Sequence, residues 1–430
     1  MENKDFKGKK LLILGANAET VPLVNVAKEM GVVTIVTSSI KDDTAKEVAD
    51  IAYDVDGVDV PGLIELARKE NVDGVLVGVA DVLVPIYCKV CDALDLPCYA
   101  TEEIVKIFSY KDRFKACCEK YGIHGIPEFY LDEDLNRDDL AKIQYPVVVK
   151  PVDSRSGIGI TVCYEEIEIE NAVREALAHS RCKRFIVEKY MQCDDMGIYY
   201  TFKDGECSAS CVYDRYTTGK QAGKSRVCLG GTYPSKHIDE YFTRMHDNAC
   251  RMFKEIGIRD GVLMFSAFYE NGEFYVYDTG FRLQGEAPHI LMKAIHGFDQ
   301  REMLIRFALT GSEGDIDLKK EDDSYLRGKW AATYWVLLGA GTIADIKGLE
   351  DLETDSHVVA NIQRLNAGDT IRENWIGTEK QVLTRLYFVC DSKKELAETI
   401  EEYRNRISVL DVNGKEMVVD AVDVDAALRR

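Results

Sequence analysis

The sequence predicts a protein of mixed α/β and α+β class, in which a doubly wound parallel sheet is followed by lobes of paired strands. Strands and helices alternate through the first hundred residues, and hairpins replace this alternation further along the chain. A chain of 430 residues is also too long for a single hydrophobic core. We therefore expect one domain over residues 1–105, a second region over 106–310 and a C-terminal lobe over 311–430.

The first region consists of apolar strand-like runs separated by amphipathic stretches. Ligands of such sheets collect beyond the carboxyl ends of the strands, which here means near Gly15, Asn17, Gly78 and Asp81. The expected strands span 10–14, 32–37, 51–55 and 74–77, and the expected helices end at residue 30 or span 61–70 and 82–94.

The middle region contains strands and a hairpin rather than a regular alternation. The turn Glu270-Asn271-Gly272 has the residue types of a tight hairpin and joins two strand-like runs. Charged residues 393–407 predict a helix in the C-terminal lobe, which begins with a strand over 330–338. The other expected strands of the middle region span 145–150, 160–164, 184–190, 262–269 and 273–278.

Composition limits the classes of partner. Lys and Arg total 54 against 74 Asp and Glu, a net charge of −20 that disfavours nucleic acid and anionic membranes. The charged N-terminus lacks the apolar core of a signal peptide, and no apolar run approaches the roughly 18 residues of a membrane span. The thirteen scattered cysteines fit reduced thiols, so we expect a cytoplasmic protein.

Two other site types are disfavoured by their motifs. Cys88 and Cys91 form a C-x-x-C with Cys98 nearby, but no second pair completes a zinc set, and the segment also fits a helix that buries small thiols. The turn GANAE after the first strand lacks the second and third glycines of a dinucleotide-binding turn, which makes an NAD site unlikely.

The segment VVVKPVDSRSGIGI has the residues of a phosphate-binding loop. Lys150 ends a buried strand, and Gly157 and Gly159 follow in a loop whose backbone N–H groups can approach phosphate oxygens. Read alone, the segment fits a β-hairpin with a loose turn equally well.

Two further segments place charged side chains at strand ends. In FIVEKYMQCDD, Glu188 is placed to accept from an adenine amine and Asp195 from ribose hydroxyls, although ordinary surface charges would look the same. In FYVYDTGFRLQGE, Asp278 suits Mg²⁺, while Arg282 can neutralise charge on a transferred phosphoryl group. A salt-bridged loop is the alternative interpretation of this segment.

The order of these segments resembles the ATP-grasp superfamily. YENGEFYVYDTGFRLQGEAPH is similar to the MgATP segment of biotin carboxylases and carbamoyl phosphate synthetase-like ligases. VVVKP with its Ser/Gly loop resembles the phosphate-covering loop, VEKYM the adenine hinge, and SYKDRFKACCEKYGI the segment with the first ATP-binding lysine. Residues 341–417 resemble the C-terminal lobe of the L-amino-acid ligase branch.

The resemblance implies an ATP-grasp fold with a pre-grasp domain, a two-lobed nucleotide-binding region and a C-terminal lobe. It implies a ligase that uses ATP and Mg²⁺ to join a small carboxylic acid to an amine through an acyl phosphate, releasing ADP and phosphate, with a homodimer as the favoured assembly. The implied catalytic residues are Arg282 and Lys150; the nucleotide contacts are Lys111, Lys150, Ser156, Gly157, Gly159, Glu188, Lys189, Tyr190, Met191 and Asp195; the metal ligands are Asp278 and Glu286.

The sequence departs from the family at two metal-binding positions. Ser266 stands where the family has a Glu, and Gly280 replaces the Asn of E-x-N-x-R. Three interpretations follow: Asp278 holds Mg²⁺ with phosphates and water, Glu286 substitutes, or the protein binds nucleotide with impaired turnover. A carboxylase or carbamoyl-forming enzyme that uses bicarbonate is a further alternative, and R-L-x-G after Arg282 resembles ATP-grasp proteins of surface-polysaccharide synthesis.

Three other features have less specific interpretations. We expect His289 and His296 to be structural or solvent-facing, and residues 213–226 to form a mobile loop near the acceptor site.

Overall fold

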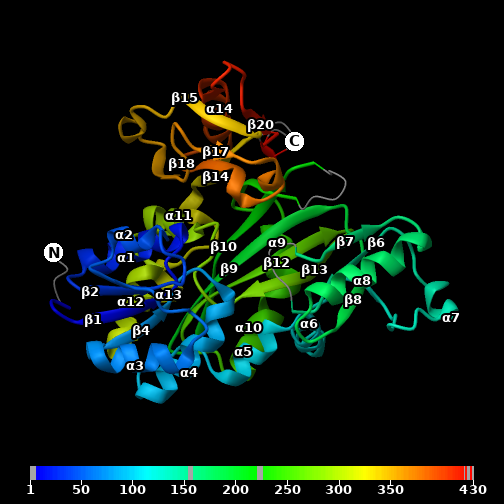
Figure 1. Ribbon diagram of the computed structural model, residues 1–430, viewed down its shortest axis with the longest axis horizontal. Coiled ribbons are helices and arrows are strands. Elements are labelled where there is room, and N and C mark those ends of the chain that lie inside the picture. The colour runs from blue at the N-terminus through cyan, green and yellow to red at the C-terminus, as the bar shows by residue number, and fades with distance from the viewer. Residues whose placement is uncertain (1–5, 154–157, 220–225, 421, 424–426, 429–430) are drawn as a thin grey trace.

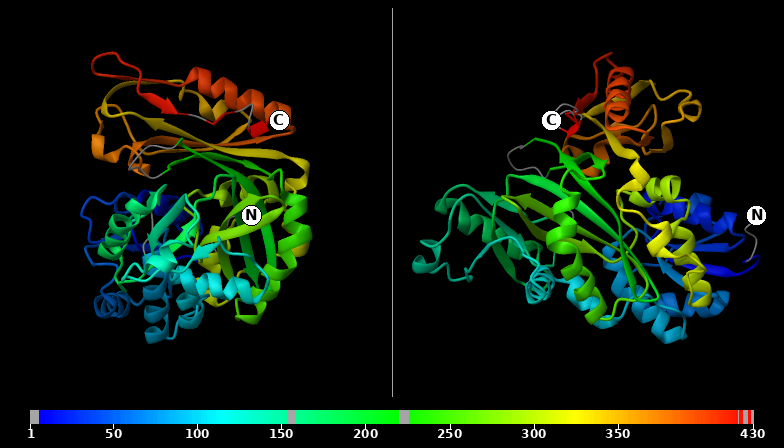
Figure 2. Two further views of the ribbon diagram at one scale, coloured as in Figure 1. Left: turned by 90° about the vertical axis from the view of Figure 1, so that its right-hand side faces the viewer. Right: turned by 180° about the vertical axis from the view of Figure 1, so that it is seen from behind.

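The computed structural model describes residues 6–153, 158–219, 226–420, 422–423 and 427–428 (Figure 1). Three lobes surround a central set of long strands: the N-terminal sheet, a small lobe around β6–β8, and the C-terminal lobe. The two further views show the same arrangement from the side and from behind (Figure 2). This arrangement confirms the predicted α/β and α+β class.

The N-terminal lobe is a parallel sheet with the strand order β3-β2-β1-β4. Because β1 pairs in parallel with both β2 and β4, the residues after β1 and β4 meet at one edge, where Gly78 N–H donates to Leu14 O at 2.9 Å. The strands are β1 (Lys10–Leu14), β2 (Val33–Thr37), β3 (Ile51–Tyr53) and β4 (Gly74–Val77), and the helices are α1 (Val21–Glu29), α2 (Ala45–Val48), α3 (Val60–Glu70) and α4 (Val84–Leu94).

Two residues explain where the third helix begins and ends. Asp59 accepts a hydrogen bond from Gly62 N–H at the first turn, and Asn71 ends the helix in the left-handed conformation.

The helix α4 buries Cys88 and Cys91, and the thiols of Cys88 and Cys98 both donate to Ala100 O. The helical interpretation of the C-x-x-C segment is therefore confirmed.

The small lobe is an antiparallel sheet with the order β5-β8-β6-β7, covered by α8. Val147 and Val149 of β6 alternate with a less buried residue, so one face of the strand packs against Ala172 and Ala176 of α8. The elements are β5 (Glu128–Phe129), β6 (Val147–Pro151), β7 (Thr161–Cys163), β8 (Phe185–Lys189) and α8 (Ile169–His179).

The largest sheet has the order β13-β12-β9-β10-β11-β14-β18-β16, and β20 pairs with β14. The predicted hairpin is present: Asn271 and Gly272 both have positive φ, as a tight turn between β12 and β13 requires. The strands are β9 (Asp194–Lys203), β10 (Glu206–Thr217), β11 (Cys228–Tyr233), β12 (Gly261–Glu270), β13 (Glu273–Gly280), β14 (Trp330–Leu338), β16 (Val358–Gln363), β18 (Val382–Cys390) and β20 (Val418–Asp420).

One prediction about this sheet is wrong. Residues 213–217 of the expected loop form the end of strand β10, where they pair with β9 and β11. The rest of that segment includes residues 220–225, which lie outside the described part of the chain.

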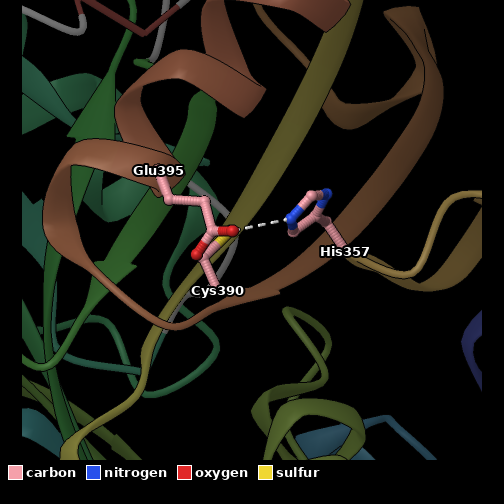
Figure 3. Close-up of side chains that lie close together, drawn as sticks. All are labelled: His357, Cys390 and Glu395. Atoms are coloured by element: carbon pink, nitrogen blue, oxygen red, sulfur yellow. Dashed lines mark hydrogen bonds and ion pairs between the residues drawn. The ribbon is translucent and has the colours of Figure 1, made fainter.

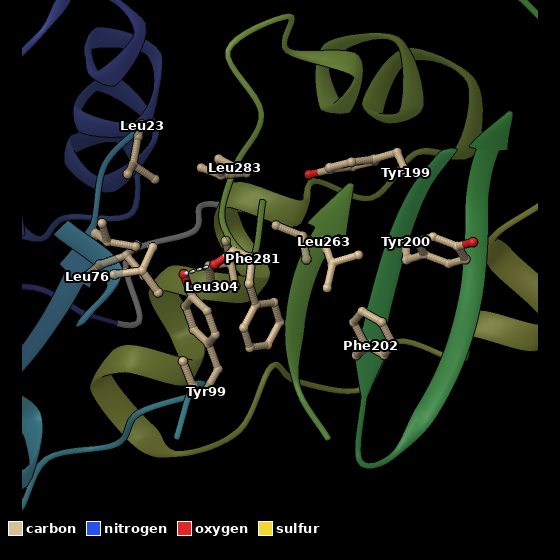
Figure 4. Close-up of a cluster of buried hydrophobic side chains, with 14 of the residues drawn as sticks. Leu23, Leu76, Tyr99, Tyr199, Tyr200, Phe202, Leu263, Phe281, Leu283 and Leu304 are labelled. Atoms are coloured by element: carbon tan, nitrogen blue, oxygen red, sulfur yellow. Dashed lines mark hydrogen bonds between the residues drawn. The ribbon is translucent and has the colours of Figure 1, made fainter. Parts of the chain in front are cut away.

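The N-terminal lobe and the large sheet share one hydrophobic core (Figure 4). Leu76 of β4 and Leu304 of α12 (Gln300–Thr310) belong to the same cluster as Leu263 of β12, and Tyr99 O–H donates to Phe281 O at 3.4 Å. The helix α12 packs on β4 and β1, so the chain returns to its first sheet after completing the hairpin. These lobes therefore form one packed body.

The C-terminal lobe has its own core around Trp335 and Leu386 and a small sheet of order β17-β15-β19. Its long helix begins where the Ser392 side chain accepts from Glu395 N–H. These elements are β15 (Gly341–Lys347), β17 (Thr370–Ile371), β19 (Ser408–Asp411) and α14 (Lys393–Arg406).

The remaining helices are α5 (Glu102–Ser109), α6 (Lys111–Lys120), α7 (Arg137–Leu140), α9 (Ile238–Tyr241), a π-helical turn (Phe242–His246), α10 (Asp247–Glu255), α11 (Pro288–His296), α12 (Gln300–Thr310), α13 (Leu318–Glu321) and the 3₁₀ turns Ala18–Thr20, Asp81–Leu83, Glu166–Glu168, Leu326–Gly328, Leu352–Thr354, Glu373–Trp375 and Glu379–Gln381. Among the described helices, none combines the length and the hydrophobicity that crossing a membrane requires.

Candidate active site

A pocket of about 210 Å³ lies where the end of the N-terminal sheet meets the hairpin of the large sheet. Its charged residues come from three separate elements: Asp81 follows β4, Lys111 begins α6, and Asp278 lies near the end of β13. The full lining is Asp81, Phe108, Ser109, Lys111, Phe114, Asp278, Thr279 and Arg282. The fold thus brings together residues that the sequence analysis placed in different segments.

Arg282 links the two sides of this pocket. Its Nη2 forms an ion pair with Asp81 Oδ2 at 2.6 Å, and its Nη1 donates to Leu283 O at 2.7 Å. Burial lowers the pKa of Arg282, and the nearby Asp278 carboxylate opposes this shift. The buried Nε of Arg282 has no hydrogen-bond partner among the described residues. A buried N–H without a partner is a donor that an anionic ligand would satisfy.

The two predicted phosphate-binding lysines lie close to this pocket and to each other. Burial is the largest cause of the lowered pKa of Lys111, and the charge of Lys150 adds to that shift while Asp278 opposes it. Lys150 Nζ forms a buried ion pair with Glu188 Oε2 at 2.6 Å. Any anion that engages Lys150 therefore competes with Glu188, which the sequence analysis assigned to adenine instead.

The predicted adenine hinge is partly occupied by contacts within the protein. Lys189 N–H donates to Pro127 O and Tyr190 N–H to Pro146 O, so neither of these main-chain donors faces an empty position. Lys189 Nζ pairs with Glu270 at 2.6 Å, and Met191 is buried. The role of this segment in binding adenine stays a prediction.

The predicted phosphate loop is only partly described. Ser156 and Gly157 lie outside the described residues. Gly159 has a φ of +73°, and a Cβ there would lie 2.9 Å from both His179 Cβ and Pro151 Cγ. This position therefore requires glycine for its conformation and for its packing.

A second polar cluster is built around Arg215, a residue that the sequence analysis did not identify. Its guanidinium donates to Ser266 Oγ at 3.1 Å and to Tyr277 O–H at 3.0 Å, and its Nε pairs with Glu286 Oε1 at 3.1 Å. The Asp195 carboxylate lies 3.7 Å away and accepts from Tyr277 at 2.9 Å. Burial raises the pKa of Asp195 to about 6.

Glycine makes this cluster possible. Gly197 of β9 lies across from Tyr213, and a Cβ at position 197 would lie 2.1 Å from the Tyr213 ring. The freed space lets Tyr213 O–H reach Glu286 Oε2 at 2.7 Å and accept from Gln284 Nε2 at 2.6 Å. Sequence analysis identifies Ser266, Asp195 and Glu286 separately but assigns the Tyr-Asp-Arg-Tyr run that contains Arg215 to a loop.

These contacts place Glu286 in the Arg215 cluster, and its role as a magnesium ligand stays a prediction. Both of its carboxylate oxygens contact Tyr213 or Arg215, and it does not belong to the lining of the pocket that holds Asp278. The second carboxylate that lines the pocket is Asp81. Asp195, expected at a ribose, is likewise held by the Arg215 cluster.

A third arginine ties the loop after β13 to the C-terminal lobe. Arg385 Nη1 donates to Gly285 O at 2.5 Å, and its guanidinium lies 3.9 Å from the centre of the Trp335 ring. Its Nη2 pairs with Glu379 at 2.9 Å and lies 3.6 Å from Glu19 of the N-terminal lobe. The N-terminal lobe and the C-terminal lobe thus both contribute to the contacts around this loop.

The two histidines after the loop are structural, as expected. His289 is buried, and burial lowers its pKa to about 3, so it is neutral near pH 7. His296 is also buried, beside Asp322 at 3.0 Å.

Known proteins resemble parts of this sequence. A family described as the D-ala D-ala ligase C-terminus matches residues 128–220. A formate-dependent phosphoribosylglycinamide formyltransferase from Sulfurisphaera tokodaii is 30% identical over 201 residues, covering 44% of this chain and 49% of that protein. The chain thus spans about half the length of that relative. A D-alanine–D-alanine ligase from Borrelia turicatae is 29% identical over 24% of this chain and 30% of that protein.

Solved structures resemble nearly the whole chain. An L-amino acid ligase from Bacillus licheniformis matches with a TM-score of 0.76 and 17% identity over 94% of this chain and 99% of that one. A biotin carboxylase from Campylobacter jejuni matches with a TM-score of 0.74 and 16% identity over 98% and 94%. The chain has the ATP-grasp fold.

Ser266 and Gly280, the two residues at which the sequence departs from the expected pattern, both lie beside charged residues. Ser266 of β12 is the cross-strand partner of Asp278, and its hydroxyl accepts from Arg215. Gly280 faces Asp81: a Cβ at position 280 would lie 3.0 Å from Asp81 Oδ1. A charged neighbour therefore lies beside each position at which the family has a metal ligand.

Proposed function

We propose that this protein is an ATP-dependent carboxylate–amine ligase that acts through an acyl phosphate. The observation that carries the proposal is the pocket in which Lys111, Asp278 and Arg282 converge within an ATP-grasp fold. The relatives support it, because they include D-alanine–D-alanine ligases and an L-amino acid ligase.

The reaction proceeds in two steps. A carboxylate oxygen of the acid attacks the γ-phosphorus of ATP, the bond to the β–γ bridging oxygen breaks, and ADP leaves. The amine nitrogen then attacks the acyl carbon, the bond to phosphate breaks, and the amine loses a proton. The protein supplies positioning and charge neutralisation for both steps.

Each charged residue of the pocket has a role in this reaction. Lys111 and Lys150 would hold the α- and β-phosphates, and Gly159 would allow the loop to approach them. Arg282, with its buried unpartnered Nε, would neutralise charge on the transferring group. Around the pocket, positive groups lie close together in a protein whose net charge is −20.

The pocket also fits a magnesium ion. We propose that Asp278 holds it and that Asp81, which would exchange its ion pair with Arg282 for the ion, is the second carboxylate, since both aspartates line the same pocket. Oxygen ligands of this kind, completed by phosphates and water, are what Mg²⁺ prefers, and the ion would neutralise phosphate charge.

A second candidate function is nucleotide binding with impaired turnover. Arg215 favours it, because its guanidinium donates a hydrogen bond to the hydroxyl of Ser266, which stands where the family has a metal-binding Glu. A bicarbonate-using enzyme is the third candidate, and it is suggested by the likeness to biotin carboxylases. For the ligase we expect small acids and amines as partners, a homodimer and a cytoplasmic location.

The test is ADP release from Mg²⁺ and ATP, measured with panels of acids and amines. The ligase predicts release that requires both an acid and an amine, and that falls at least about tenfold in Asp278→Asn and Asp81→Asn. Glu273→Gln, on an exposed part of the same strand as Asp278, is the matched control. ATP binding with no release in any mixture would favour the second candidate, and release driven by bicarbonate alone the third.

A further inference from the structure

Three side chains with the chemistry of transition-metal ligands converge in the C-terminal lobe (Figure 3). His357 precedes β16, Cys390 is the last residue of β18, and Glu395 lies in the first turn of α14. One ligand atom from each lies within 4.8 Å of the other two, and the figure shows the three groups facing one another. None of them belongs to the pocket described above.

The backbone fixes the positions of these residues. Val389 N–H donates to His357 O at 2.9 Å, so the histidine is held beside the end of β18. Asp391 N–H donates to Glu395 Oε2 at 2.7 Å, which leaves Oε1 of the same carboxylate turned toward the histidine. The site is therefore pre-formed by the β16–β18 pairing and by the start of α14.

The imidazole is oriented as in many metal sites. Its Nδ1 lies 2.9 Å from Asp355 Oδ1, and Tyr403 O–H donates to the other oxygen of Asp355 at 2.9 Å. A carboxylate on one imidazole nitrogen fixes the ring and leaves the other nitrogen to face a metal. Here that nitrogen is Nε2 of His357, which lies 3.1 Å from Glu395 Oε1.

Two carboxylates flank the imidazole, so the arrangement favours a positive charge between them. A neutral imidazole has one N–H and donates to Asp355 or to Glu395, but not to both. The arrangement is satisfied either by a doubly protonated ring between two carboxylates or by a metal ion between Nε2, Glu395 Oε1 and the Cys390 sulfur. The buried Cys390 thiol packs in the core of the C-terminal lobe and lies 3.7 Å from Thr399 Oγ1, and it would also supply the sulfur ligand that a borderline-soft metal favours.

We propose that His357, Cys390 and Glu395 form a binding site for a divalent transition metal of the zinc type. Metal bonds of about 2.0 Å to nitrogen and oxygen and about 2.3 Å to sulfur put tetrahedral ligand atoms about 3.3 to 3.7 Å apart, so only small movements are needed. Mg²⁺ and Ca²⁺ are disfavoured, because they select all-oxygen sites. Half-exposed His357 and Glu395 leave a fourth position for water.

Binding would join the edge strand β16 to α14 through a single ion. Cys390 binds as the thiolate and His357 through an unprotonated Nε2, so the thiol proton passes to the buffer, together with the Nε2 proton where the ring was doubly protonated. Because the folded lobe brings the ligands together and the unfolded chain does not, the metal should stabilise the C-terminal lobe.

The test is titration of the reduced, chelator-treated full-length protein with Co²⁺, followed by replacement with Zn²⁺. We expect one Co²⁺ with a thiolate charge-transfer band in the wild type, and loss of that band in Cys390→Ser. Glu395→Gln should keep the band with affinity at least about tenfold lower. Zn²⁺ should bleach the band and raise the unfolding temperature of the wild type more than that of either variant.

The matched control is Cys250→Ser. Cys250 Sγ lies 3.1 Å from Cys207 Sγ and 3.6 Å from His246 Nε2, so this is a second thiol–imidazole group that could capture the probe. The proposal predicts an unchanged band in this variant. A band that persists in Cys390→Ser, or one that disappears in Cys250→Ser alone, would overturn it. So would the absence of a band in the wild type, which would leave an imidazolium ion pair as the account of the cluster.

Discussion

At the residue scale, weakly exposed charges are compensated by a guanidinium, by an ammonium group as in the Lys150–Glu188 pair, or by protonation. Arg215 compensates Asp195 and Glu286, and Arg282 compensates Asp81. Removing one member of such a buried group would leave a charge without compensation, which is far more costly than the group is stabilising. Glu313 is an example of a buried carboxyl group that avoids the charge by protonation.

Glu313 is buried near Asp260 and accepts from Gly261 N–H at 3.2 Å. Burial, and then the Asp260 carboxylate, raise its pKa to about 9, far above the roughly 4.3 of an unfolded chain. Between these values the native state holds the extra proton, so the free energy of unfolding falls as the pH rises.

We therefore expect Glu313→Gln to remove part of the pH dependence of stability. Urea unfolding should show that the free energy of unfolding of the wild type falls between pH 5 and pH 8 by at least about 1 kcal/mol more than that of the variant, since one pKa unit corresponds to about 1.4 kcal/mol. An equal fall in the two proteins would show that Glu313 is ionised in the native state.

At the element scale, the short buried strands could be predicted from sequence and the long polar ones could not. Strands β1 and β4 have the predicted bounds, because continuous apolar runs between turn residues identify buried parallel strands. The end of β10 was missed because buried Asp214 and Arg215 look like loop residues until their partners on other strands are known. The Arg215 cluster depends on contacts that sequence spacing does not encode.

The strand pair β9–β10 also yields a prediction. A methyl group at Gly197 would overlap the Tyr213 ring and displace it from Glu286. Gly197→Ala should lower the free energy of unfolding by about 1–3 kcal/mol, the usual cost of overpacking. Gly219→Ala is the matched control, because a Cβ there meets no atom within 4 Å. Equal stability of the two variants in urea would contradict the packing described for β9 and β10.

At the scale of the whole molecule, the candidate site depends on the packing of lobes against each other. Asp81 comes from the N-terminal lobe, Lys111 from the segment that links it to the small lobe, and Asp278 from the large sheet. The shared core keeps these residues together. Motif order predicted Lys111 and Asp278, and the strand ends predicted a ligand near Asp81, but the meeting of all three in one pocket follows only from the packed lobes.

The most direct test of the central claim is calorimetric titration with ATP, with and without Mg²⁺, of the wild type, Lys150→Ala and the control Lys142→Ala. Lys142 is exposed in the same lobe and pairs only with nearby Asp139 among the described residues. The account predicts binding that Mg²⁺ tightens, that Lys142→Ala preserves and that Lys150→Ala loses. ATP affinity that is the same with and without Mg²⁺ would favour nucleotide binding with impaired turnover. No ATP binding by the wild type would contradict the account.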